Sequence, residues 1–189
     1  MDMALIQDFW KDFKRLPSAW LLLVQLSMLF LYLFTNTSRS FQILSWALGV
    51  LVLLIIAKVI RQTPTFTILG LFFVLGAFVF SILMLMGLRT VPMQMLAHAF
   101  EAAAYFSAAY GLVRYMFEDR YLTKDELFAA GAVFTLIAWG FAFLYSICQL
   151  AVPQSFLNPN HLADYQSWLD LLFLSFSLHI ASDFITILF

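Results

Sequence analysis

The sequence has few charged residues, a single cysteine and little glycine or proline. Charged side chains make up 11% of its 189 residues, whereas soluble domains contain about 25%. The formal net charge of −1 gives no electrostatic basis for a nucleic-acid partner. One cysteine, Cys148, excludes an intrachain disulfide framework and a multi-cysteine metal site. Seven glycines and five prolines exclude a low-complexity chain.

Sequence patterns typical of enzymes are also missing. The three histidines, at positions 98, 161 and 179, lack the spacing of a zinc-protease motif. The seven glycines are isolated from one another, so they form no phosphate-binding loop, and no nucleophile-elbow motif occurs. We therefore expect no catalytic residues, no cofactor and no metal site.

Hydrophobic residues make up 63% of the chain, and their distribution predicts a membrane protein. A membrane-spanning helix needs about 20 predominantly apolar residues. Five segments meet this requirement, and a sixth apolar segment lies at the C-terminal end: 18–35, 41–60, 66–88, 93–117, 127–150 and 168–189. The sequence thus predicts an all-α integral membrane protein, a helical bundle of five spanning helices plus a sixth apolar segment.

The N-terminal segment and the basic residues indicate how the chain lies in the bilayer. In residues 1–16, Leu5, Phe9 and Phe13 recur at helical spacing, which predicts an interfacial helix on the membrane surface. With a cytoplasmic N-terminus, eight Lys and Arg residues lie inside and two, Arg39 and Arg89, lie outside. This asymmetry favours a cytoplasmic N-terminus.

Two ionisable side chains fall within the fourth expected span. His98 and Glu101 are three residues apart, so they share one helix face, and Tyr105 follows on the same face. Ionisable groups at membrane depth are costly and suggest a functional site. We expect the pair to be mainly structural, holding two helices in register. The alternative is a proton relay or ion site. Repeated arginines typical of a voltage sensor do not occur in this span, which contains only Arg114.

Small residues recur every fourth position on two of the expected spans, a pattern that lets helix backbones approach closely in lipid. We expect these positions to mediate packing within the chain, with an oligomer contact as the alternative. They are Ala99, Ala103, Ser107 and Gly111 in the fourth span, and Ala138, Ala142 and Ser146 in the fifth.

The C-terminal half follows the order of elements found in a channel pore. The span at 127–150 is followed by a polar loop with Pro153 and Pro159, and then by an apolar stretch opening with Trp168 and Asp170. Together with residues 110–116, 123–129 and 134–136, this order resembles the pore module of bacterial six-helix potassium channels. The resemblance covers residues 95–180.

This resemblance implies a division of the chain and a set of partners. Residues 17–117 would form a four-helix transmembrane bundle. Residues 118–189 would form a pore-like module with an outer helix at 127–150, a turret loop at 151–167 and a re-entrant pore helix with a filter-like segment at 168–189. The resemblance also implies a homotetramer in a bacterial inner membrane, with a monovalent cation such as potassium as the conducted ion.

The filter-like segment departs from the family in composition. Its ion-pathway candidates are His179, Ile180, Ala181, Ser182 and Asp183, and no glycine follows Gly140. Potassium filters rely on backbone carbonyls held in conformations that glycine permits, so we expect no selectivity for potassium over sodium. We expect a helix at 168–178 with a non-helical or frayed continuation at 179–183. The family's inner pore helix has no counterpart within the 189 residues.

Three functional hypotheses follow. The first is a subunit of a cation channel that does not sense voltage. The second is a non-conducting membrane protein, an assembly partner or a remnant of such a channel. The third is a small proton-coupled transporter that uses His98 and Glu101.

Overall fold

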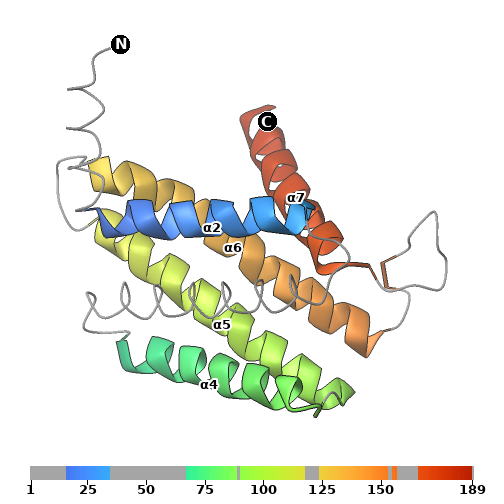
Figure 1. Ribbon diagram of the computed structural model, residues 1–189. Coiled ribbons are helices and arrows are strands. Elements are labelled where there is room, and N and C mark those ends of the chain that lie inside the picture. The colour runs from blue at the N-terminus through green and yellow to red at the C-terminus, as the bar shows by residue number, and fades with distance from the viewer. Residues whose placement is uncertain are drawn as a thin grey trace. The chain divides into compact units, whose positions relative to one another are not determined.

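The computed structural model describes residues 16–34, 67–88, 90–117, 124–152, 155–156 and 166–188. Within these residues the fold is all-α, as expected, with five helices and no strand. The helices are α2 Pro17–Phe34, α4 Thr67–Leu85, α5 Val91–Met116, α6 Lys124–Ala151 and α7 Trp168–Leu188 (Figure 1).

Each of these helices coincides to within a few residues with one of the apolar segments expected from the sequence. The agreement confirms that these segments are helical. Three other expectations concern the interfacial helix at 1–16, the span at 41–60 and the turret loop at 151–167. These lie wholly or mostly outside the described residues.

The C-terminal segment corrects one expectation. A non-helical or frayed continuation was expected from His179 to Asp183, but α7 continues without a break from Trp168 to Leu188. The helix continues because residues 168–188 contain neither glycine nor proline. Nothing in this segment therefore disfavours helical backbone strongly enough to end the helix. The expected break after Leu178 is wrong.

Among the described residues, one helix is long and apolar enough to cross a membrane, Asp125–Ala151 of α6, with a mean hydropathy of 2.1. α5 has 26 residues, but it includes His98, Glu101 and Arg114. The other apolar helices contribute shorter segments, Ser18–Leu31, Ile68–Met84 and Trp168–Ala181.

The chain forms two compact units, each built from separated parts of the sequence. The first comprises residues 1–67 and 108–135, and the second comprises residues 68–107 and 136–189. As a result, α5 and α6 each contribute one part to either unit.

In the first unit, α2 packs closely on the first part of α6. The Leu22 side chain lies against Gly131, 3.2 Å from the position that a Cβ atom would occupy there. One turn further along both helices, the Thr135 hydroxyl donates to Oε1 of Gln25 at 2.6 Å, and both side chains are buried. Gly131 therefore leaves room for the close approach of α2 and α6, and the buried hydrogen bond joins them.

In the second unit, α4 packs on the first part of α5 through one aromatic ring. The Phe100 ring covers Gly76, and a Cβ atom at Gly76 would overlap it. Three further rings from α4 lie within 5.3–6.3 Å of Phe100, measured between ring centroids, and they belong to Phe72, Phe73 and Phe80. Phe100 is thus the centre of the contact between these two helices.

The small residues of the two expected stripes are buried on α6 but only partly buried on α5. On α6, the expected positions are all buried, which agrees with packing inside the chain: Ala138, Ala142 and Ser146. On α5, Ala97 and Ala104 are completely buried, whereas Ala99 of the expected stripe is exposed. α5 has alanines on several faces, so its sequence does not show which face turns inward.

α4 ends at a Schellman motif centred on Gly87, whose φ of 98° is a conformation that residues with side chains rarely adopt. The Gly87 N–H donates to the Met84 carbonyl, and the Leu88 N–H donates to the Leu83 carbonyl, both at 3.2 Å. The chain then enters α5, and α4 lies alongside the first part of α5 (Figure 1).

The start of α7 is fixed by side chains on both sides of the preceding loop. The Gln149 side-chain amide donates to the Gln166 carbonyl at 3.1 Å and accepts the Gln166 N–H at 2.9 Å. The Ser167 N–H donates to Asp170 at 3.1 Å, while the Asp170 N–H donates to the Ser167 hydroxyl at 3.3 Å. This reciprocal arrangement is a capping box with aspartate as its acid.

Candidate functional site

The ionisable pair expected on α5 is formed in the second unit. Nδ1 of His98 lies 2.9 Å from Oε2 of Glu101, a distance typical of a charge-assisted hydrogen bond. The three-residue spacing therefore brings the two side chains into direct contact. The side chains keep 23% and 15% of their surface exposed, respectively, so neither is sealed inside the protein.

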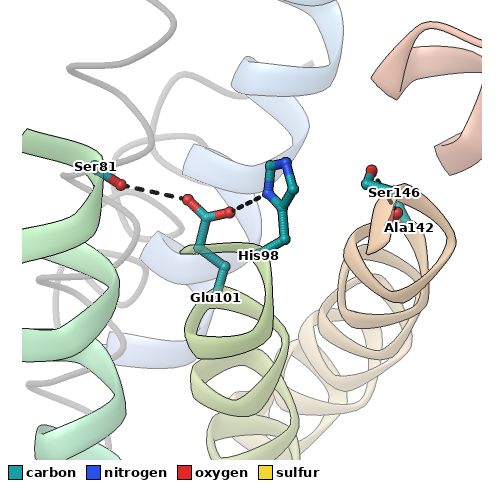
Figure 2. A network of polar contacts seen from close by, with 5 residues as sticks. All are labelled: Ser81, His98, Glu101, Ala142 and Ser146. Atoms are coloured by element: carbon teal, nitrogen blue, oxygen red, sulfur yellow. Dashed lines mark hydrogen bonds and ion pairs between the residues drawn. The ribbon is translucent and has the colours of Figure 1, made fainter. Parts of the chain in front are cut away.

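The second partner of Glu101 comes from α4 and was not expected from the sequence. The Ser81 hydroxyl donates to Oε1 of Glu101 at 3.4 Å. In Figure 2 the Glu101 carboxylate lies between Ser81 and the His98 ring, so that each of its oxygens faces one donor. Ser81 could not be identified from sequence, because its role depends on how α4 and α5 pack.

These bonds differ in strength as well as in origin. The short bond joins two residues on the same turn of α5, whereas the bond between helices, from Ser81, is close to the longest distance of a hydrogen bond. The polar cluster formed by Ser81, His98 and Glu101 therefore contributes little to holding α4 against α5.

An aromatic ring from α6 stacks on the histidine. The His98 ring stacks on Phe143 of α6 with a centroid distance of 5.6 Å and an interplanar angle of 29°. Phe143 also stacks with Tyr105, at 5.5 Å and 19°. Stacking on Phe143 holds the plane of the imidazole while Nδ1 points to Glu101.

The proton of the hydrogen bond between His98 and Glu101 can reside on Nδ1 of the histidine or on Oε2 of the glutamate. When Glu101 is ionised, the Nδ1–H of His98 donates to Oε2. When Glu101 is protonated, its O–H can donate to an Nδ1 that carries no hydrogen. The pair can therefore change its protonation without losing the contact between the two residues, which is the property required of a proton-exchange site.

The five filter-like candidates all belong to α7 rather than to a loop. Nδ1 of His179 lies 2.9 Å from the Ser175 carbonyl, to which it donates, and the His179 ring packs edge-on against Phe141 at 5.2 Å. Ile180 and Ala181 are exposed. The side chains of Ser182 and Asp183 lie outside the described part of the structure.

A second polar cluster, which sequence reasoning missed, occurs in the first unit at Asp125. This buried carboxylate accepts hydrogen bonds from the Ser18 N–H at 3.3 Å, the Ser18 hydroxyl at 3.1 Å and the Tyr115 hydroxyl at 3.2 Å. Asp125 lies in the first turn of α6, and Ser18 lies in the first turn of α2. Asp125 is therefore placed near the N-termini of two helices, where negative charge is favourable.

The sequence signal for Asp125 was an acid at the start of an expected helix. Its main partner, Ser18, is 107 residues away in sequence, so the pairing depends on tertiary structure. Each carboxylate oxygen is engaged by helix-capping or interhelical donors, which marks this cluster as structural.

The chain matches no family model, no curated protein and no solved structure.

Proposed function

We propose that the protein is a small helical membrane protein that moves protons or monovalent cations across the bilayer through the carboxylate of Glu101. The observation that carries this proposal is the geometry of Glu101 itself. It is the eleventh of the 26 residues of α5, about 15 Å along the helix from Val91. With Val91 at one boundary of the bilayer, Glu101 would lie close to the middle of a hydrocarbon layer about 30 Å thick.

The membrane placement is supported by apolar side chains on the outside of the protein. Four residues on one face of α4 are each at least 45% exposed: Ile68, Phe72, Leu75 and Val79. Burying one such side chain away from water is favourable by about 1.5–3 kcal/mol. A continuous stripe of this kind suits contact with lipid chains. The length and hydropathy of α6 agree with this placement.

A transport role is supported over a purely structural one by the two hydrogen bonds to Glu101. Holding α4 and α5 in register requires a strong bond between them, but among the described contacts of Glu101 the bond to α4 is the 3.4 Å contact from Ser81. The strong bond, to His98, stays within α5. An ionisable group that is not needed for helix association is free to change its protonation state during transport.

The channel hypothesis rests on the resemblance of residues 95–180. Because α7 runs as a helix through the segment expected to form the filter, we base the proposed ion pathway on Glu101 rather than on Asp183. A channel-like pore lined by α7 stays a prediction.

The proposal is tested by proton and cation flux in proteoliposomes. The wild-type protein should collapse an imposed pH or cation gradient, and Glu101→Gln should abolish this flux while preserving the fold, because the amide has nearly the shape of the carboxylate. Asp170→Asn is the matched control, since Asp170 is an exposed acid that caps α7. It should retain wild-type flux.

Two results would overturn the proposal. The first is wild-type flux in a Glu101→Gln variant that has been shown to be folded by its tryptophan fluorescence. The second is a folded wild-type protein that moves neither protons nor monovalent cations.

A further inference from the structure

Along the polar face of α5, exposure decreases from His98 through Glu101 to Tyr105. Gln94, His98, Glu101 and Tyr105 follow one another at spacings of four, three and four residues, so they lie on one face of the helix. Gln94 is partly exposed, the His98 and Glu101 side chains are 23% and 15% exposed, and Tyr105 is 3% exposed. The accessible end of this face is therefore the one near Val91.

Beyond Glu101 the face is closed by an aromatic layer. Tyr105 contacts Trp139 and Phe143 of α6, with centroid distances of 5.6 and 5.5 Å. Both α6 rings in turn contact Trp168 at the start of α7, at 5.5 and 5.7 Å. Rings from three helices thus meet at the level of Tyr105, which is itself almost completely buried.

The groups around Glu101 suit a proton better than a metal cation. Both carboxylate oxygens face hydrogen-bond donors, the Ser81 hydroxyl on one side and Nδ1 of His98 on the other. A dehydrated cation needs several oxygen ligands that present lone pairs. Donors pointed at a carboxylate instead stabilise its ionised form and can hand it a proton.

We infer that Glu101 exchanges protons only with the water at the Val91 end of α5, and that His98 relays them. This inference rests on the proposed function, because it specifies the transported ion and the side from which it enters. Glu101 then has one-sided access in the described conformation, and protons reach the other side only after the aromatic layer opens.

The relay step begins with a neutral His98 ring that carries its hydrogen on Nδ1. The Nδ1–H bond of His98 breaks as an O–H bond forms at Oε2 of Glu101, and Nε2 takes a proton from a hydronium ion in the adjoining water. The ring is neutral before and after the step, and the charge of the hydronium ion is cancelled by the carboxylate. Among the described contacts of this pair, α4 contributes the Ser81 hydroxyl and α6 contributes the Phe143 ring, neither of which carries charge.

Carbodiimide labelling measures the side of access without measuring flux. Dicyclohexylcarbodiimide dissolves in the bilayer and reacts with protonated carboxyl groups, so its rate of reaction with Glu101 follows the protonated fraction. Membrane vesicles of both orientations would be prepared with different pH inside and outside. Mass spectrometry of the peptide containing Glu101 would give the rate, and Glu101→Gln would identify the labelled residue.

The side that faces Val91 is assigned independently by a cysteine at position 90. Thr90 is exposed at the start of α5, and a Thr90→Cys variant in a Cys148→Ser background would react with an impermeant maleimide from one side. We expect a drop of one pH unit on that side to raise the labelling rate by up to about tenfold. The same drop on the opposite side should leave the rate unchanged.

The relay is tested by His98→Gln, which keeps hydrogen-bonding capacity but cannot transfer a proton. Proton flux should fall by at least about tenfold, while Glu101 should still be labelled. Faster labelling after acidification of the opposite side would overturn the one-sided access, and unchanged flux in His98→Gln would overturn the relay. Neither result affects the proposed function, which fails only if Glu101→Gln retains flux or the wild type has none.

Discussion

The buried carboxylate of Asp125 should be one of the most important polar groups for stability. In the first unit it accepts three hydrogen bonds, two from Ser18 and one from Tyr115. Replacing Asp125 with alanine removes both acceptor oxygens, and with them all three hydrogen bonds, and takes the negative charge away from the first turns of α2 and α6. The Ser18 N–H and hydroxyl, which are buried, would lose their partner.

The size of the effect follows from the geometry. A hydrogen bond to a charged group contributes about 1.5–3 kcal/mol. The three bonds to Asp125 measure 3.1–3.3 Å, longer than charge-assisted bonds of good geometry, which measure about 2.7–2.9 Å. We therefore assign about 1 kcal/mol to each, and Asp125→Ala should lower the free energy of unfolding by about 3 kcal/mol.

Asp170→Ala provides the matched control. Asp170 also lies in the first turn of a helix, but it is exposed, and its partner Ser167 is local. Loss of such a cap costs about 1 kcal/mol. Both variants would be unfolded by denaturant in mixed micelles and followed by tryptophan fluorescence. The reasoning about Asp125 is refuted if the two variants lose the same amount of stability.

Three further predictions concern the helix contacts and ends, each read from the unfolding free energy in the same assay. Gly76→Ala should cost about 1–3 kcal/mol through overlap with Phe100, and Phe100→Leu should relieve it; no relief would contradict the contact. Gly87→Ala should cost about 1–2 kcal/mol although the space around it is open, because its positive φ strains a side chain; a neutral effect would contradict that conformation. Ala181→Pro should cost about 3 kcal/mol or more because α7 is continuous there, whereas tolerance would restore the expected non-helical segment.

The positions of the helices could be predicted because the sequence carries strong local signals for them. Long apolar runs identified α2, α4, α6 and α7, and turn residues such as Gly87 lie where a helix ends. The break expected after Leu178 came from the order of elements in a channel family rather than from the residues themselves. The absence of glycine and proline from 168–188 was the better indicator.

The candidate site could be predicted only in part. The pairing of His98 with Glu101 follows from their spacing on one helix, which sequence shows directly. The contacts made by Ser81, by Phe143 and by Asp125 with Ser18 join different helices, and no local pattern indicates these pairings. The inward face of α5 was missed for the same reason, because alanines occur all around that helix.

Phe100 and Glu101 are neighbours on α5, but they contribute differently to its contact with α4. Phe100 packs into the space over Gly76 and joins α5 to α4, while Glu101 makes only a long hydrogen bond to that helix. Since association of the two helices depends on the ring, neutralising the acid should hardly affect it. We expect Glu101→Gln to change the free energy of unfolding by less than about 1 kcal/mol, well below the effect of Gly76→Ala when the two are unfolded side by side. A loss in Glu101→Gln as large as that in Gly76→Ala would mean that the carboxylate holds the helices together, and it would contradict this separation of packing from the ionisable group.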